Sequence, residues 1–261
     1  MTSKAEATIR SAKASRAGAL VGYLPIGYPD LATSIEAAIT LTQHGVDMLE
    51  LGLPYSDPVI DGPTIQAATT IALEQGFRLK HAFEAVREIS RASDAAVLCM
   101  TYYNPVLSYG VERFAADLAE AGGAGLITPD LVPEEAGEWI AASDASGLDR
   151  IFLAAPSSPE ARLRRAAESS RGFTYVVSTM GITGARSDVD SAARGLVDRL
   201  RAVTARPLAV GIGISTGEQV ADVLTYADGA IVGSLLVTAL GKGLDALADT
   251  ADGLAAGTRK V

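Results

Sequence analysis

Two carboxylic acids in one short stretch of the sequence, Glu50 and Asp61, have the residue types and spacing for acid–base chemistry. Glu50 lies inside an apolar run, residues 48–53, that is typical of a buried strand, where an ionised carboxylate is costly unless it is paired or used. Asp61 follows in the proline-rich segment 54–63, which predicts a stiff loop. If this loop folds back over the end of the strand, both acids could reach one substrate from two sides. The alternatives are turn-forming roles for Asp57 and Asp61 and a core ion pair for Glu50.

A second group of residues suits a phosphate. Gly211, Gly213 and Ser215 follow one predicted strand, and Gly233 and Ser234 follow the last one. Backbone N–H groups and the start of a short helix at these points could hold a phosphate without a cationic side chain. The alternative is that the glycines only permit tight turns.

A long polar loop, residues 178–187, is suited to a lid that excludes water, although a passive surface loop fits the same pattern. Tyr102 and Tyr175 fall at or just past predicted strand ends, where they could face the site or pack in the core.

Residue types that the sequence lacks at these positions narrow the reaction class. No lysine falls in or just after a predicted strand, which removes the nucleophile of a Schiff-base mechanism. The lysines are Lys4, Lys13, Lys80, Lys242 and Lys260. His44 and His81 lie on predicted helices, and with the single Cys99 in an apolar run we expect no metal site. The carboxylates must then carry out the proton transfers, in an isomerisation or a carbon–carbon cleavage.

Apolar runs and helical periodicity alternate regularly along the chain. Strands are predicted at residues 19–24, 47–52, 95–101, 125–128, 150–154, 173–177, 207–210 and 229–232. Helices are predicted at residues 7–16, 31–44, 64–75, 79–90, 111–121, 134–142, 159–169, 190–203 and 216–226, with helical sequence from the last strand to 257. Residues 102–105 are expected in a loop.

Eight strand–helix units in a chain of 261 residues predict an α/β fold, a closed (β/α)8 TIM barrel with an extra N-terminal helix. We expect residues 1–261 to form a single domain. A doubly wound open sheet is the alternative. The dinucleotide-binding fingerprint is not met, because the glycine after Gly211 and Gly213 comes at Gly217.

Composition limits the partners and the compartment. The net charge is −9 and no basic run stands out, so we expect no nucleic-acid partner. The N-terminal residues lack the apolar core of a signal peptide, and no stretch offers ~20 apolar residues to span a bilayer. A single cysteine permits no disulfide framework. These features predict a soluble, cytoplasmic protein.

Several motifs resemble those of one known family, the α subunit of tryptophan synthase. They are Glu50-Leu-Gly-Leu-Pro-Tyr-Ser-Asp-Pro58, Asp61-Gly-Pro-Thr64, Pro129-Asp-Leu-Val-Pro133, Met180-Gly-Ile-Thr-Gly184, Gly211-Ile-Gly-Ile-Ser215 and Gly233-Ser234. They occur in the family's order over residues 20–237.

The resemblance implies a lyase of tryptophan biosynthesis that splits indole-3-glycerol phosphate into indole and glyceraldehyde 3-phosphate by a retro-aldol step. Glu50 would be the acid–base group, and Asp61 would stabilise the indole nitrogen as charge develops. The resemblance and the loop positions together give the substrate-binding residues Tyr23, Met100, Tyr102, Ile127, Tyr175, Thr183, Gly184, Ile212, Gly213, Gly233 and Ser234. Phenylalanine is commoner in the family at Tyr23, Tyr55 and Ile212, so details of the pocket differ here.

The resemblance also implies a partner, a β subunit in an α2β2 heterotetramer that receives the indole. Pyridoxal phosphate is expected only in that β subunit, and this chain has no cofactor of its own. Three other interpretations are a barrel isomerase acting on a phosphorylated sugar, a non-catalytic barrel that regulates a partner, and a stand-alone enzyme that releases free indole.

Overall fold

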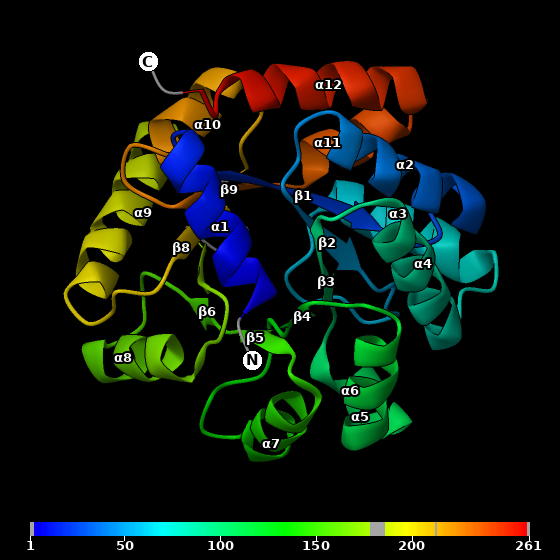
Figure 1. Ribbon diagram of the computed structural model, residues 1–261, viewed down its shortest axis with the longest axis horizontal. Coiled ribbons are helices and arrows are strands. Elements are labelled where there is room, and N and C mark those ends of the chain that lie inside the picture. The colour runs from blue at the N-terminus through cyan, green and yellow to red at the C-terminus, as the bar shows by residue number, and fades with distance from the viewer. Residues whose placement is uncertain (1–2, 178–185, 212, 260–261) are drawn as a thin grey trace.

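A barrel of parallel strands surrounded by helices forms the molecule (Figure 1). The computed structural model describes residues 3–177, 186–211 and 213–259. The strands are β1 (Ala19–Pro25), β2 (Met48–Gly52), β3 (Ala96–Met100), β4 (Gly125–Ile127), β5 (Asp149–Ile151), β6 (Leu153–Ala154), β7 (Thr174–Val177), β8 (Leu208–Gly211) and β9 (Gly229–Val232). The helices are α1 (Lys4–Ser15), α2 (Leu31–Gln43), α3 (Pro63–Glu74), α4 (Leu79–Ala92), α5 (Tyr103–Tyr109), α6 (Val111–Glu120), α7 (Gly137–Ser146), α8 (Glu160–Ser169), α9 (Arg186–Arg201), α10 (Gly217–Val223), α11 (Ser234–Leu240) and α12 (Leu244–Ala256).

The sheet closes through a strand that is split in two. Its order is β5-β4-β3-β2-β1-β9-β8-β7-β6, with every neighbouring pair parallel. β5 pairs with β4 and β6 pairs with β7, and only Phe152 separates β5 from β6 along the chain. The nine strands therefore form the eight-stranded barrel that the sequence predicts, with its fifth strand interrupted at Phe152.

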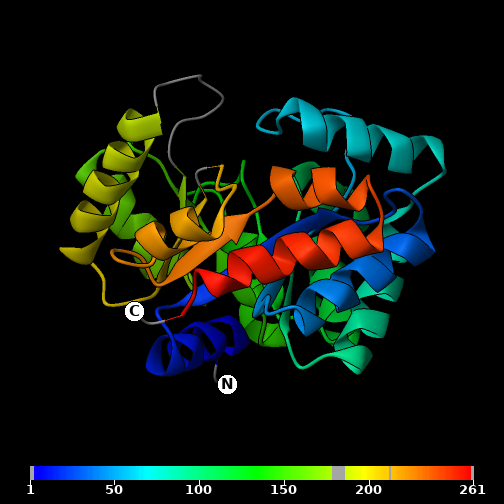
Figure 2. The same cartoon turned by 90° about the horizontal axis from the view of Figure 1, so that it is seen from above.

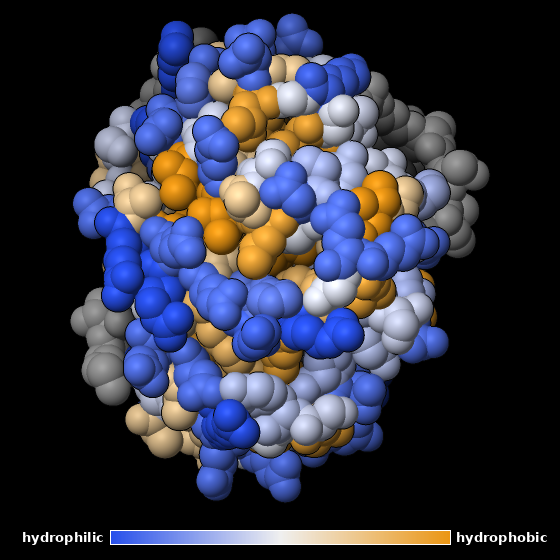
Figure 3. Space-filling view, turned by 90° about the vertical axis from the view of Figure 1, so that its right-hand side faces the viewer, coloured by the Kyte–Doolittle hydropathy of each residue, from blue (hydrophilic) through white to orange (hydrophobic). Residues whose placement is uncertain are grey.

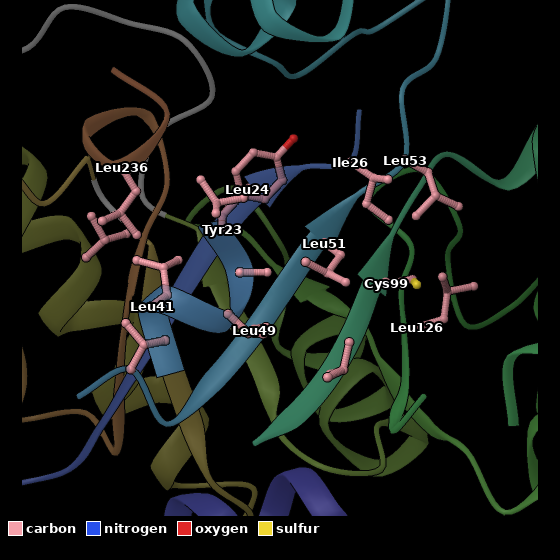
Figure 4. Close-up of a cluster of buried hydrophobic side chains, with 14 of the residues drawn as sticks. Tyr23, Leu24, Ile26, Leu41, Leu49, Leu51, Leu53, Cys99, Leu126 and Leu236 are labelled. Carbon is pink, nitrogen blue, oxygen red and sulfur yellow. The ribbon is translucent and has the colours of Figure 1, made fainter. Parts of the chain in front are cut away.

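Alternate residues of the strands face the two sides of the barrel wall. One cluster fills the interior and includes Val21, Met48, Leu98, Ile127 and Phe173. The other lies between the strands and the helices, where Leu24, Leu49, Leu51 and Cys99 pack with side chains such as Leu41 and Leu236 (Figure 4). Strands that are buried on both sides explain the nearly continuous apolar runs in the sequence.

The two ends of the barrel are covered differently. Helix α1 lies at one end, opposite the end where α3 lies (Figure 2). Ala5, Ile9 and Ala12 of α1 pack against the interior cluster, and Asp149 accepts hydrogen bonds from the Ser3 hydroxyl and the Ala5 amide at 2.9 and 3.0 Å. The predicted extra N-terminal helix is thus confirmed, and the structure shows that it covers the amino ends of the strands.

The outer surface of the helices is mixed in character. On the side of the molecule that carries α2 and α4, hydrophobic patches are interrupted by hydrophilic side chains (Figure 3). Within the described residues, no helix combines the length and apolar character needed to cross a membrane.

Candidate active site

Glu50 lies on the interior face of the barrel in the middle of β2, two residues before the strand ends. It follows Met48 of the interior cluster by two residues, and its Cα pairs with Tyr23 on β1 and Leu98 on β3. Glu50 is 1% exposed, and its Oε2 atom has no hydrogen-bond partner in the described part of the chain. No described cation forms an ion pair with it either, so the described residues do not support a core ion pair.

The surroundings of Glu50 favour its neutral form. Burial raises the pKa of Glu50 to about 8, and the nearby Asp61 carboxylate adds to the increase. A carboxyl group with this pKa carries a proton at neutral pH and can donate it.

Asp61 lies in the loop between β2 and α3, residues 53–62, which we call the acidic loop. The side chain is half-buried, and this burial raises the pKa of Asp61 above its usual value. Gln66 of α3 donates from Nε2 to the Asp61 carbonyl oxygen at 2.7 Å, and Pro63 begins α3 two residues after Asp61. The Asp61 carboxylate lies near enough to Glu50 to raise the pKa of Glu50, as expected for a loop that folds back toward β2.

Two tyrosines on the interior face lie close to the acids. Their hydroxyl groups occupy space that is open because two neighbouring residues are glycines without a side chain. A Cβ atom on Gly52 would lie 2.2 Å from the Tyr23 hydroxyl, and one on Gly211 would lie 2.7 Å from the Tyr175 hydroxyl. Burial raises the pKa of both tyrosines, and Glu50 contributes to each increase. The Tyr23 hydroxyl points away from the aliphatic cluster beside it (Figure 4).

The expected pocket residues of β3 and β4 lie on the same face as the acids. Met100 pairs in register with Gly52 and with Ile127; Ile127 belongs to the interior cluster and the partly buried Met100 packs against it. Tyr102 comes two residues after Met100, and its hydroxyl accepts hydrogen bonds from the Val59 and Ile60 amides. The structure thus brings Tyr102 against the acidic loop.

Two of the glycines expected at the phosphate, Gly213 and Gly233, follow the neighbouring parallel strands β8 and β9 and so lie at the same end of the barrel. Gly213 is exposed with φ +73°, and a Cβ there would meet no atom within 4 Å. Gly233 precedes α11, whose first helical hydrogen bond runs from the Val237 amide to the Gly233 carbonyl. The amides at the start of α11, from Ser234 onward, are therefore not used within the helix. A Cβ atom added at Gly233 would lie 3.5 Å from the Tyr23 ring. This end of the barrel therefore adjoins the tyrosine beside the two acids.

Part of the expected site lies outside the described residues. This part consists of Ile212 and of most of the expected lid, residues 178–185, with Thr183 and Gly184. Within the described residues, no group of three or more His, Cys, Asp and Glu side chains is arranged to hold a metal ion.

Sequence reasoning missed two features of the site. Gly52 leaves room for Tyr23, and its spacing of two from Glu50 would have placed it on the same face. Residues 103–109 form α5 instead of a loop, and Asp130 receives hydrogen bonds from the Tyr103 amide at 2.9 and 3.1 Å at the start of this helix. A helix of seven residues is too short to show a clear helical periodicity, and the residue that stabilises its start, Asp130, is distant in the sequence.

Comparisons with known proteins agree with this geometry. The family model for the tryptophan synthase alpha chain matches residues 9–260. Among curated relatives, the tryptophan synthase alpha chain of Leifsonia xyli is 66% identical over 236 residues, covering 90% of each chain, and that of Mycobacterium marinum is 56% identical over 250 residues, covering 96% of this chain and 93% of the relative.

Solved structures give the same result. A structure of Mycobacterium tuberculosis tryptophan synthase aligns over 100% of both chains with a TM-score of 0.95 and 52% identity. A chain of the tryptophan synthase a2b2 complex from Pyrococcus furiosus aligns over 92% of this chain and 98% of that chain, with a TM-score of 0.85 and 36% identity. With two carboxylic acids at the carboxyl end of a closed barrel and matches of this extent, the chain belongs to the tryptophan synthase alpha chain family.

Proposed function

We propose that Glu50 and Asp61 carry out the proton transfers in the cleavage of indole-3-glycerol phosphate to indole and glyceraldehyde 3-phosphate, the lyase reaction of this family in tryptophan biosynthesis. The observation that carries the assignment is the Glu50 carboxyl group, which is 1% exposed, has an oxygen without a partner among the described residues, and lies near Asp61. A buried carboxyl group without a structural partner is expensive to keep, which favours a functional role.

The proton balance of the reaction fits one group that acts first as acid and then as base. Protonated Glu50 donates its proton to C3 of the indole ring, and positive charge develops at the ring nitrogen. The Asp61 carboxylate accepts a hydrogen bond from the ring N–H and stabilises that charge. Ionised Glu50 then takes the proton of the glycerol hydroxyl next to the scissile bond. The bond from C3 to the glycerol carbon breaks, its electrons restore the indole ring, and Glu50 is again protonated.

The substrate spans the pocket from the acids to the glycines. We expect the indole ring between Tyr23, Met100, Ile127 and Tyr175, with Tyr102 and Ile212 completing the pocket. We expect the phosphate at Gly213, Gly233 and Ser234, with Gly184, and Thr183 in the lid that closes over the substrate. Support comes from the position of Gly233, where an added Cβ atom would lie 3.5 Å from the Tyr23 ring, so the two parts of the pocket adjoin.

We further propose a β subunit as partner, in an α2β2 assembly that takes up the indole, because a solved relative from Pyrococcus furiosus is an a2b2 complex. Pyridoxal phosphate would belong to that β subunit. Lys4, Lys13, Lys80 and Lys242 lie on α1, on α4 or between α11 and α12, so none of them could form a Schiff base at the carboxyl end of the barrel. The buried, single Cys99 fits a reducing cytoplasm.

Product analysis tests the reaction. Purified chain is incubated with indole-3-glycerol phosphate, alone and with a matching β subunit, and indole and glyceraldehyde 3-phosphate are quantified. We expect equal amounts of both products, formed slowly by the chain alone and faster with the β subunit, because closure of loops near a partner couples the two sites. Fast release by the chain alone would indicate a stand-alone indole lyase. No indole under either condition would contradict the proposal and favour the isomerase or the regulatory barrel.

A further inference from the structure

We propose that Tyr102 is a positioning residue for Asp61, which fixes the acidic loop by accepting two hydrogen bonds from its backbone. This inference rests on the proposed function, because it explains how Asp61 is held where that reaction needs it. It gives the Tyr102 hydroxyl a role in the protein itself, in addition to the expected contact of its ring with substrate.

The hydrogen bonds join Tyr102 to the residues just before Asp61. The Val59 amide donates to the Tyr102 hydroxyl oxygen at 2.8 Å, and the Ile60 amide donates to the same atom at 3.0 Å. Tyr102 itself is 6% exposed. The Val59 side chain, by contrast, is 81% exposed, so the loop turns its amides inward at a point where its side chain faces outward.

Tyr102 is well placed to act as an anchor because its own position is fixed. It directly precedes α5, whose first residue donates from its amide to Asp130. The Tyr102 ring packs against the ring of Tyr55, also in the acidic loop, with centroids 5.2 Å apart and an angle of 34° between the planes. At the start of the loop, the Leu53 amide donates to the Met100 carbonyl at 2.9 Å. The loop is thus tied to the end of β3 at its beginning and, just before Asp61, to Tyr102, which comes two residues after that end.

The chemistry of the phenol explains why a tyrosine is needed. Two N–H donors occupy the acceptor sites of the hydroxyl oxygen, so its proton remains free to be donated. Phenylalanine would keep the ring contact with Tyr55 but would leave the Val59 and Ile60 amides without this acceptor. The loop would then sample other conformations, and Asp61 would spend less time where the indole nitrogen lies. A displacement of about 1 Å in a catalytic group is enough to reduce the rate by about 10²-fold.

The test compares Tyr102→Phe with Tyr103→Phe in indole release from indole-3-glycerol phosphate. Tyr103 is the matched control, because its buried hydroxyl has no hydrogen-bond partner in the described residues. We expect Tyr102→Phe to lower kcat by about 10- to 100-fold with a much smaller change in KM, because the loss affects a group that acts in the transition state. Tyr103→Phe should keep the wild-type kcat.

A second comparison separates positioning from a general structural role. If Tyr102 acts through Asp61, then Tyr102→Phe should lower the residual rate of an Asp61→Asn enzyme by no more than about 3-fold, because effects within one unit are not additive. A loss of the same size in both backgrounds, or a wild-type kcat for Tyr102→Phe, would overturn the proposal.

Amide hydrogen exchange supplies a readout that does not depend on activity. Tyr102→Phe should speed exchange in residues 53–62 by at least about 10-fold, while Tyr103→Phe should not. Unchanged exchange would overturn the anchoring role. A wild-type chain that releases no indole would instead refute the proposed function, while the exchange result would still decide whether Tyr102 holds the loop.

Discussion

At the scale of single residues, the site depends on one carboxyl group in an unfavourable place. Glu50 lies in a barrel interior made otherwise of residues such as Met48, Leu98 and Phe173. Burial and the charge of Asp61 make ionisation of Glu50 difficult, so its pKa rises to about 8. The same unfavourable environment makes Glu50 a proton donor at neutral pH. An exposed glutamate, with a pKa near 4.3, would already be ionised at that pH.

The raised pKa predicts how stability depends on pH. Because Glu50 has a higher pKa in the folded chain than in the unfolded chain, the unfolded state loses its proton first as pH rises. The free energy of unfolding of the wild type should therefore fall by a few kcal/mol between about pH 4.5 and pH 8 through this group alone. Glu50→Gln removes the effect. The melting temperature of the variant minus that of the wild type should therefore increase from about pH 4.5 to pH 8 and stay constant above pH 8.

Thermal melting from pH 5 to pH 9 checks this prediction, with Glu36→Gln as control. Glu36 is an exposed residue on α2, so this variant should follow the wild-type curve at every pH. A constant difference between Glu50→Gln and wild type across the range would contradict the raised pKa.

The sequence predicts the acids of the site better than the contacts that hold them in place. Glu50 and Asp61 stand out because a carboxylate in an apolar run, or in a rigid proline-rich loop, calls for an explanation. The hydrogen bonds of Tyr102 to the acidic loop could not be predicted in the same way, because Tyr102 and Ile60 are 42 residues apart and meet only after β2 and β3 pair.

At the scale of elements, loops at the carboxyl ends of strands hold the groups that would touch substrate. The acidic loop after β2, the glycines after β8 and the start of α11 lie at one end of the barrel, whereas α1 covers the other. Helix α5 is the element that the sequence did not predict. Its start is stabilised by Asp130 from the loop after β4, and short helices depend on such tertiary contacts more than on their own sequence.

Gly233 offers a test of the phosphate position. Its φ of −119° lies outside the left-handed region that favours glycine, and an added Cβ would make only an ordinary 3.5 Å contact with Tyr23. Gly233→Ala should therefore fold normally but crowd the phosphate, raising KM by about 10-fold or more with a smaller effect on kcat. Gly213→Ala is a less specific test, since φ at Gly213 is +73° and alanine would strain the backbone there.

The KM and kcat of Gly233→Ala and wild type are compared by steady-state kinetics with indole-3-glycerol phosphate as substrate. Gly253→Ala on α12 is the control, because a Cβ there meets no atom within 4 Å and lies on a helix that covers the outside of the barrel. Wild-type KM in Gly233→Ala would count against phosphate binding at this glycine.

At the scale of the whole molecule, alternation of strands and helices was sufficient to predict a closed barrel. Eight predicted units correspond to the barrel found, and the interruption at Phe152 could not be foreseen because residues 151–154 form one apolar run. The predicted helix 134–142 is shifted to Gly137–Ser146, because the boundaries of a helix are marked less clearly in a sequence than its presence.

Charged contacts at the amino ends of the strands complete the barrel on the side away from the site. Asp228, just before β9, pairs with Lys13 of α1 and Arg201 of α9, and its Oδ2 accepts from the Leu208 amide at 2.9 Å. Burial opposes ionisation of Asp228, but these partners outweigh it and lower its pKa. The molecule therefore separates a stabilising end, where the buried Asp149 and Asp228 carboxylates form ion pairs, from a functional end, where Glu50 forms none with a described cation.

The most direct test of Glu50 as the acid–base group is the rate of indole release by Glu50→Gln. The variant keeps the size of the side chain but cannot exchange a proton in this way, so turnover of indole-3-glycerol phosphate should fall by at least ~10²-fold. Its melting curve near pH 6 should show a folded protein, and Glu36→Gln should keep wild-type turnover. Near wild-type turnover in Glu50→Gln would contradict the account.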